Sequence, residues 1–387
     1  MTTPLNIVAD AHIWGVREAF SSLPGFDVCL RILENNQITR DSLLDCDILL
    51  TRSATKVNAE LLSGTSVRFA ATATIGDDHY DKNWLNRQQI AWASAAGSST
   101  GSVLEYMLTL LLDLHMQGLI AIPKTTIGII GAGRIGGELA KLCRQLGMTV
   151  LVNDPPRARI EGSEGFCSLQ DILSQADLIT LHTPLIRDGE ECTFHLLDTE
   201  RLEAFKGLGI INAARGDCID NSALLDWLNV DHNHFAALDC WEHEPQPLTP
   251  LIKHRQMAIS SPHIAGHSLD GKAANTLFIY QALCRFLHIK PEWKMQLPPP
   301  PDALNMNISN DVWHNLHTAA SSLYPLQGDH QGMQSWADLC PKELAQAFTG
   351  YRRHYPIRRA WHHCPIHIST DNTQTRLLAD AIGLKLI

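Results

Sequence analysis

Three polar side chains in the second half of the sequence have the types that proton transfer beside a bound anion requires. His263 follows a proline in Ser261-Pro-His-Ile-Ala-Gly266, and Glu244 lies in Leu238-Asp-Cys-Trp-Glu-His-Glu-Pro245. A histidine that accepts a hydroxyl proton needs a carboxylate to set its tautomer and to stabilise its cation. Arg215, in Asn212-Ala-Ala-Arg-Gly216, offers a guanidinium for a carboxylate and for an oxygen on which charge develops.

Each of these three residues also has an ordinary structural interpretation. Arg215 could form a helix-cap ion pair, Glu244 could be a solvated loop acid, and His263 could be a hydrogen-bonded loop histidine. The catalytic interpretation is favoured because all three follow, in this order, a nucleotide-binding pattern.

That pattern is the glycine turn Gly131-Ala-Gly-Arg-Ile-Gly136, which stands between an apolar run at 127–130 and a helical pattern. Gly131 permits a tight turn, Gly133 lets backbone amides reach a pyrophosphate, and Gly136 lets helix and strand pack closely. The pyrophosphate would lie at a helix N-terminus, beside Arg134 and Ile135. The alternative is a glycine-rich turn without a nucleotide.

A carboxylate at the end of the next apolar run predicts which dinucleotide binds. Asp154 follows the run at 148–152 and lies about 20 residues beyond Gly136, the spacing expected of an acid that holds the ribose hydroxyls. Because a carboxylate there would repel a 2′-phosphate, we expect NAD rather than NADP.

The composition excludes several other classes of protein. The net charge is −10 and lysine-rich tracts are absent, which argues against nucleic-acid and membrane-surface partners. The ten cysteines lack a CxxC pair, as is typical of reduced thiols in a cytoplasmic protein. Residues 1–4 lead directly into a strand pattern, so we expect no signal peptide. His232 with His234, and His362 and His363 with His367, lack the accompanying ligands of a metal site, and we expect no metal there.

The apolar periodicity predicts an α/β protein. Strands are expected at 5–9, 47–51, 68–73, 90–93, 127–130, 148–152, 178–181, 208–212, 235–238 and 258–260. Helices are expected at 16–20, 59–63, 98–114, 169–173 and 222–228. The strands stop at polar clusters, which is typical of a doubly wound sheet with its ligands at the carboxyl ends of the strands.

These motifs together resemble the D-isomer-specific 2-hydroxyacid dehydrogenases. Besides the motifs above, the resemblance rests on Arg52-Ser-Ala-Thr-Lys-Val-Asn58, Ala73-Thr-Ile-Gly-Asp-Asp-His79, Asp154-Pro-Pro-Arg157, His182-Thr-Pro-Leu185 and Ser268-Leu-Asp-Gly-Lys272. The Asp-Pro-Pro-Arg turn, the Thr-Lys-Val-Asn loop and about a hundred extra C-terminal residues indicate the erythronate-phosphate branch of that family.

The resemblance implies a role for each matching position. Arg215, Glu244 and His263 fall on the catalytic trio. The NAD contacts implied beside the glycine turn are Asp154, Thr183, Ala214, Asp239 and Gly266. The substrate contacts implied are Arg52, Ser53, Thr74 and His267. His267 departs from the branch, which usually has a tyrosine at this position.

The resemblance also implies the architecture. A Rossmann-type NAD domain at 98–266 would be inserted in a flavodoxin-like substrate domain formed by 1–97 and 267–289. A C-terminal α+β domain at 290–387 would pair two subunits into a homodimer. Its aromatic and apolar content suggests a partner-binding face, with four arginines at the rim or reaching a phosphate in the neighbouring subunit: Arg352, Arg353, Arg358 and Arg359.

The activity implied is NAD-dependent oxidation of 4-phospho-D-erythronate at C2 to 3-hydroxy-2-oxo-4-phosphooxybutanoate, in vitamin B6 biosynthesis. Two alternatives stay open: a phosphoglycerate or hydroxypyruvate type of dehydrogenase, and a non-catalytic NAD(H)-sensing corepressor. A formate dehydrogenase is disfavoured, because the partner of the histidine there is a glutamine rather than Glu244.

Overall fold

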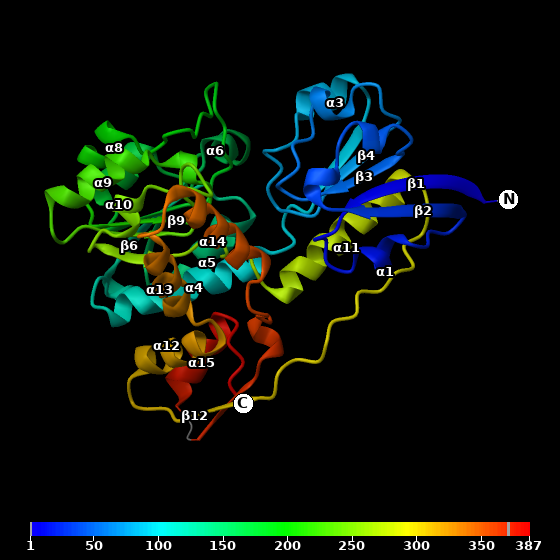
Figure 1. The fold of residues 1–387 in the computed structure, drawn as a ribbon. Helices are drawn as coiled ribbons and strands as arrows, with labels where there is room; N and C mark the ends of the chain where they lie inside the picture. Colours follow the sequence, from blue (N-terminus) through cyan, green and yellow to red (C-terminus); the bar gives the residue numbers. More distant parts are fainter. Residues whose placement is uncertain (1, 370–371) are drawn as a thin grey trace. The chain divides into compact units, whose positions relative to one another are not determined.

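The structure is a computed structural model that describes residues 2–369 and 372–387. The chain divides into two compact units, Met1–Ser99 with Ser268–Pro299 and Thr100–His267 with Pro300–Ile387 (Figure 1). Within the described part of the chain, no helix combines the length and the apolar character needed to cross a membrane.

The first unit is built on a five-stranded parallel sheet. The strand order is β2-β1-β3-β4-β5, which is the flavodoxin-like order. The strands are β1 (Thr3–Asp10), β2 (Phe26–Leu33), β3 (Ile48–Thr51), β4 (Phe69–Thr72) and β5 (Ala91–Ser94). The helices are α1 (Val16–Phe20), α2 (Ala59–Leu62), α3 (Lys82–Arg87) and α11 (Leu269–Phe286).

Both faces of this sheet are covered, and each strand contributes to two cores because its side chains alternate between the faces. Ile7 of β1 and Ile48 of β3 pair in register and face a core shared with α1 and α11. Val8 and Leu49, the next residues along, pair in the same way and face a second core with residues of α2 and α3. The polar loops after β3 and β4 are therefore left at the carboxyl edge of the sheet.

The second unit contains a six-stranded parallel sheet in the order β11-β10-β9-β8-β6-β7. The chain runs from β6 outward to β7 and then returns to β8 on the other side of β6. The direction in which successive strands are added therefore reverses at β6. Doubly wound folds bind their ligands at such a point. The strands are β6 (Thr126–Ile130), β7 (Thr149–Asn153), β8 (Leu178–Leu181), β9 (Gly209–Asn212), β10 (Phe235–Leu238) and β11 (Met257–Ser260).

Helices cover both faces of this second sheet (Figure 1). Those on one face are α4 (Thr100–Met116) and α5 (Arg134–Gln145). Those contributing to the core on the other face are α7 (Leu169–Gln175), α8 (Thr199–Ala204), α9 (Asn221–Val230) and α10 (Thr249–Ile252). The short helix α6 (Pro155–Glu161) follows β7 directly. Helix α4 is buried almost throughout, which fits its apolar sequence on all sides.

The C-terminal segment belongs to this second unit. It contains the helices α12 (Val312–Leu323), α13 (Leu326–Trp336), α14 (Pro341–Arg353) and α15 (Thr373–Ala381) and the paired strands β12 (Leu304–Met306) and β13 (Ile366–Ile368). Its apolar side chains share a core with α4, and Arg358 forms a buried ion pair with Glu105 of α4 at 2.8 Å. The segment is thus anchored to the nucleotide-binding unit by both apolar packing and charge.

This packing corrects part of the sequence interpretation. Seven side chains of this segment were expected to supply the partner-binding face: Trp336, Leu339, Leu344, Phe348, Tyr351, Tyr355 and Trp361. Of these, Leu344, Phe348 and Trp361 are 2%, 0% and 1% exposed within the chain itself, whereas the other four are half-buried or exposed. Arg358 and Arg359 are likewise buried rather than at a rim. The Rossmann-like parallel α/β fold is confirmed, whereas the division into three domains stays a prediction.

Candidate active site

Loops after three neighbouring strands of the second sheet bring the expected catalytic residues together. Arg215 follows β9, Glu244 lies in the loop after β10, and His263 follows β11. Together they line a pocket of about 340 Å³. Gly216 lets the loop after β9 lie close to the loop after β10, since a Cβ there would lie 1.9 Å from the carbonyl of Trp241. The parallel strand order therefore converts three distant stretches of sequence into one site.

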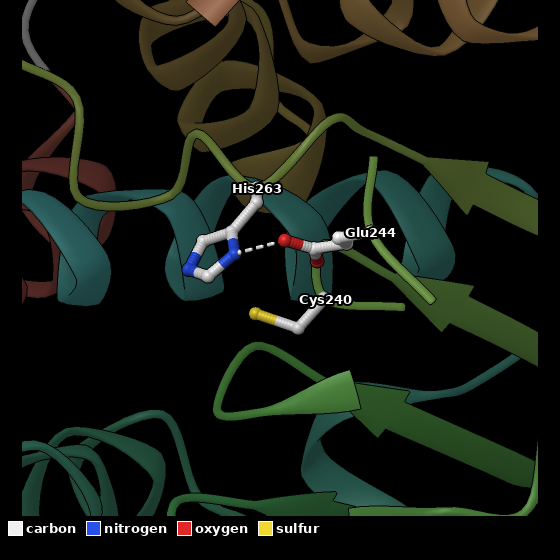
Figure 2. Close-up of side chains that lie close together, drawn as sticks. All are labelled: Cys240, Glu244 and His263. Atoms are coloured by element: carbon white, nitrogen blue, oxygen red, sulfur yellow. Dashed lines mark hydrogen bonds and ion pairs between the residues drawn. The ribbon is translucent and has the colours of Figure 1, made fainter. Parts of the chain in front are cut away.

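His263 and Glu244 form a direct hydrogen bond. Nδ1 of His263 lies 2.8 Å from Oε2 of Glu244, and the other ring nitrogen points away from the carboxylate (Figure 2). The second oxygen of Glu244 accepts a hydrogen bond from the backbone N–H of Trp241 at 2.8 Å. The side chain of His263 is 31% exposed and that of Glu244 is 20% exposed. The imidazole is therefore fixed from the protein side and open to a ligand on the other.

The electrostatics keep Glu244 ionised. Burial alone would raise the pKa of Glu244, but the charge and hydrogen bond of His263, together with Arg352 and the Trp241 amide, lower it below 4.5. Because the carboxylate is an acceptor only, Nδ1 of His263 carries the proton and the far nitrogen Nε2 is left to accept one. This arrangement orients the imidazole as a general base would require.

Cys240 completes a close group with this pair, since ligand-type atoms of Cys240, Glu244 and His263 all lie within 4.8 Å of one another (Figure 2). Burial raises the pKa of the Cys240 thiol well above its ordinary value. Its sulfur donates to the carbonyl of Ala214 at 3.3 Å. The thiol is therefore neutral, and the charged partners are the glutamate and the histidine.

Glu242, in the same loop as Glu244, pairs with a second histidine, His195, which lies between β8 and α8. Oε1 of Glu242 is 2.6 Å from Nε2 of His195, and Oε2 accepts the backbone N–H of Asn221 at 2.8 Å. Glu242 is 8% exposed and does not line the pocket that contains His263. The two glutamates of Trp241-Glu-His-Glu244 thus have different partners, and only Glu244 meets the candidate base.

The loop that carries His263 is held by Asp239. The Asp239 carboxylate accepts hydrogen bonds from the Ser261 hydroxyl at 2.7 Å and from the backbone N–H groups of Ile264 at 2.7 Å and Ala265 at 3.0 Å. Burial raises the pKa of Asp239 above its ordinary value, while these bonds and the charge of His263 oppose the rise. The predicted NAD contact of Asp239 stays a prediction; in the structure both of its oxygens bind this loop.

The glycine turn has the shape that a dinucleotide needs. Gly131 has a φ of +88°, and a Cβ on Gly136 would lie 1.9 Å from the carbonyl oxygen of Gly131. A Cβ on Gly133, in contrast, would meet nothing within 4 Å. The N-terminus of α5, beginning with Arg134 and Ile135, is therefore open to a phosphate, whereas the turn behind it is closely packed.

Asp154 lies beside this turn at the end of β7. Its carboxylate accepts the backbone N–H of Ala132 at 2.8 Å and that of Arg157 at 3.1 Å, and so caps α6. Three other predicted NAD contacts follow strands of the same sheet: Thr183, Ala214 and Gly266. All the predicted cofactor residues thus lie at one edge of the second sheet.

The predicted substrate contacts of the first unit lie at the ends of neighbouring strands. Arg52 and Ser53 follow β3, and Thr74 follows β4, which pairs with β3. Thr74 is half-buried, with its hydroxyl 2.7 Å from that of Thr72. Burial lowers the pKa of Lys272 below its ordinary value, and the charge of Arg52 lowers it further. Two cations therefore lie near this edge, as suits an anionic ligand.

His267 lies beside the C-terminal segment. Its ring meets the ring of Tyr355 edge-on, with 5.8 Å between the centroids. The sequence interpretation did not foresee this contact or the roles of Trp241, Ser261 and Arg352 around His263. Trp241 lies inside a motif that the sequence interpretation used. No sequence pattern around Arg352 indicated its role, because it contacts a residue that is 89 positions away in the chain.

Comparisons with known proteins agree with this site. Residues 114–265 match the family described as D-isomer specific 2-hydroxyacid dehydrogenase, NAD binding domain. Proteins named erythronate-4-phosphate dehydrogenase match along the whole chain. That of Hydrogenovibrio crunogenus is 36% identical, with 100% of both chains covered. That of Pseudomonas putida is 38% identical, with 98% of this chain and 100% of the relative covered.

Solved structures share the fold. A D-lactate dehydrogenase from Aquifex aeolicus, complexed with NAD and lactic acid, superposes with a TM-score of 0.62 at 22% identity, covering 73% of this chain and 96% of its own. An NAD-dependent formate dehydrogenase from Staphylococcus aureus, in complex with NAD, gives 0.59 at 23% identity, covering 73% and 96%.

The fold and the pocket define an NAD-dependent dehydrogenase with a nicotinamide-binding Rossmann domain. The chain belongs to the D-isomer-specific 2-hydroxyacid dehydrogenase family, in its erythronate-4-phosphate dehydrogenase branch.

Proposed function

We propose that the protein oxidises 4-phospho-D-erythronate at C2 to 3-hydroxy-2-oxo-4-phosphooxybutanoate, a step of pyridoxal 5′-phosphate biosynthesis. The observation that carries this proposal is the oriented His263–Glu244 pair, in one pocket with Arg215 at the carboxyl edge of an NAD-binding sheet. The choice of substrate is supported by full-length relatives that are named for this activity.

His263 is the general base of the reaction. Its Nδ1–H donates to Glu244, so Nε2 accepts the proton of the C2 hydroxyl as the C2–H bond breaks. The imidazolium that forms is stabilised by the Glu244 carboxylate, whose pKa is lowered and which therefore stays ionised. NAD, when bound, supplies the acceptor for the hydride that leaves C2.

Arg215 binds the substrate carboxylate and the C2 oxygen. A guanidinium can bind a carboxylate through two parallel hydrogen bonds, which fixes the position of C2. It also favours the negative charge that develops on the C2 oxygen as the proton leaves. We assign further substrate contacts to Ser53, Thr74, Arg52 and His267, and the cations Arg52 and Lys272 support an anionic substrate.

The cofactor is held by the turn and by the strand ends beside it. Amides at the N-terminus of α5 bind the pyrophosphate, and Asp154 binds the ribose hydroxyls. The residues that we assign to NAD are Gly131, Gly133, Arg134, Ile135, Gly136, Asp154, Thr183, Ala214, Asp239 and Gly266.

We also propose that the protein is a cytoplasmic homodimer paired through its C-terminal segment. Ten cysteines without a CxxC pair support a reducing compartment. Phe348 and Trp361, two of the aromatic residues first expected at the interface, are buried within the chain, so more exposed side chains are needed there. Ile357 at 79% exposure and Leu377 at 66% are apolar residues of this segment that a partner could cover.

A substrate panel tests the proposed activity. NADH formation is measured with 4-phospho-D-erythronate, D-erythronate and 3-phospho-D-glycerate. The kcat/KM for the first should exceed that for unphosphorylated erythronate by about 10²-fold or more, because a site built for a phosphate rejects a substrate that lacks it. A preference for 3-phospho-D-glycerate would assign the phosphoglycerate type. NADH binding without turnover of any substrate would favour the corepressor alternative.

A further inference from the structure

His263 has a backbone conformation that needs outside support. Its φ is +55°, in the left-handed region that residues other than glycine rarely adopt. Such a conformation is strained and persists only where the surroundings impose it. Asp239 supports one side, because its backbone carbonyl accepts the N–H of His263 at 2.7 Å. The carbonyl of His263 needs a partner of its own.

That partner comes from the C-terminal segment. Nε of Arg352, near the end of α14, donates to the carbonyl oxygen of His263 at 3.2 Å. The guanidinium lies 5.8 Å from the ring centroid of Phe348, which is one helical turn earlier and fully buried. Phe348 belongs to the same core as Trp241, the residue whose amide binds Glu244. The Arg352 side chain is therefore held by two contacts, one with the ring of Phe348 and one with the carbonyl of His263.

Arg352 also takes part in the charge balance of the pair. The titratable and charged groups around His263 are the carboxylates of Glu244, Asp239 and Asp217, the imidazole of His243, the neutral thiol of Cys240, and the cations of Arg215 and Arg352. Arg215 lines the pocket, where a substrate carboxylate would neutralise it. Arg352 instead approaches from the backbone side of His263, so its charge acts on the pair whether or not substrate is bound.

We propose that Arg352 is a positioning residue, through which the C-terminal segment holds the backbone of His263 in place and sets a positive charge beside the His263–Glu244 pair. Arg352 touches the His263 backbone and has no assigned contact with substrate or NAD. The proposal rests on the catalytic roles proposed for His263 and Glu244. It gives the C-terminal segment a role in the active site of its own chain, separate from any role in pairing subunits.

The sign of the effect follows from the charges. A cation near an imidazole disfavours the imidazolium, whereas a carboxylate favours it, so Arg352 and Glu244 act on protonation of the pair in opposite directions. Oxidation requires neutral His263 as the proton acceptor, and kcat/KM therefore falls on the acid side of the pH profile. Replacing Arg352 with a neutral residue should move this acid limb to higher pH.

The test compares pH profiles of kcat/KM for oxidation. Arg352→Gln and Arg352→Met should each raise the acid limb by about 0.5–1 pH unit and lower plateau kcat by about 3–10-fold. Methionine keeps an unbranched stem against Phe348, so it serves if the glutamine variant does not fold. Arg352→Lys keeps the charge and should leave the acid limb within about 0.2 pH units of its wild-type position. Lys342→Gln, which removes an exposed cation from the same helix, is the matched control and should leave the profile unchanged.

Two results separate failure of this proposal from failure of the proposed function. A wild-type acid limb in both neutral variants, with His263→Ala strongly impaired, would overturn the role of Arg352 alone. Near wild-type turnover of His263→Ala would instead overturn the catalytic assignment on which the proposal rests. A lower kcat with an unmoved limb would indicate a purely structural contact and would also overturn the proposal.

Discussion

The carboxylate of Asp239 holds both backbone amides that follow His263, those of Ile264 and Ala265. The Asp239 backbone carbonyl also accepts the N–H of His263 itself. The position of the candidate base on its strand end is therefore set largely by one buried aspartate, which is 1% exposed. The same aspartate is also a predicted NAD contact, and the two roles differ in their consequences.

Asp239→Asn separates these roles. An amide offers one acceptor and one donor, so at least one loop N–H would face an N–H and lose its partner. We expect a loss of about 1–3 kcal/mol in the free energy of unfolding and a fall in kcat. Urea denaturation and steady-state kinetics measure both. Asp177→Asn is the control, since Asp177 accepts the single N–H of Thr126 at 2.7 Å at the start of β6. A change confined to KM for NAD would contradict the positioning role.

Asp154→Ala should relax the discrimination against NADP. The variant removes the charge that would repel a 2′-phosphate, and Arg157 stands close by, since its backbone N–H binds Asp154. Because Asp154 also caps α6, stability should fall by about 1 kcal/mol. Asp198→Ala removes a comparable cap from α8 and should leave the NAD/NADP ratio of kcat/KM unchanged. Equal use of NAD and NADP by the wild type would disprove the assignment of Asp154.

Glu244→Gln should move the acid limb of kcat/KM to lower pH. The lowered pKa of Glu244 keeps that carboxylate ionised over the working range, so it stabilises the imidazolium that forms beside it. Without the negative charge the imidazolium is less stable, and the acid limb should therefore move by about 1 pH unit or more. Glu242→Gln makes the same change in the neighbouring pair with His195 and should not move the limb. If both variants shift it equally, the special role of Glu244 is wrong.

Ile357→Asp should shift the protein from dimer to monomer if the C-terminal segment pairs two subunits. A charge at an apolar contact costs its full desolvation on association. Light scattering gives the mass of the wild type and the variant. Val230→Asp is the control, since Val230 is equally exposed, at 79%, but lies on α9. A wild-type monomer would end the dimer proposal, and a dimeric Ile357→Asp variant would place the interface elsewhere.

The residues after the strands were predictable because strand patterns and motifs are local. The runs before Arg215 and His263 are short and apolar, and they proved to be the parallel strands β9 and β11, which flank β10 and end at the same edge of the sheet. β2 was missed although its apolar residues alternate at Phe26, Val28, Leu30 and Ile32. It is an edge strand with mostly half-buried side chains, so its pattern is weaker than the continuous apolar runs of the central strands.

The support from the C-terminal segment was not predictable in the same way. Arg352 is 89 residues from His263, and nothing in the sequence around it marks a contact with a backbone carbonyl. The same holds for Phe348 and Trp361, whose apolar character suggested a partner surface. Composition shows that such side chains need burial, but only the fold shows that α4 and the second sheet provide it.

The most direct test of the account is the turnover of His263→Ala with 4-phospho-D-erythronate and NAD. The account predicts that kcat falls by roughly two to four orders of magnitude, the usual range for loss of a general base. NAD binding and thermal stability should stay close to those of the wild type, because the imidazole is 31% exposed and, among the residues that the structure describes, is hydrogen-bonded to Glu244 alone. Turnover near the wild-type level would show that another group accepts the proton, and would contradict the account.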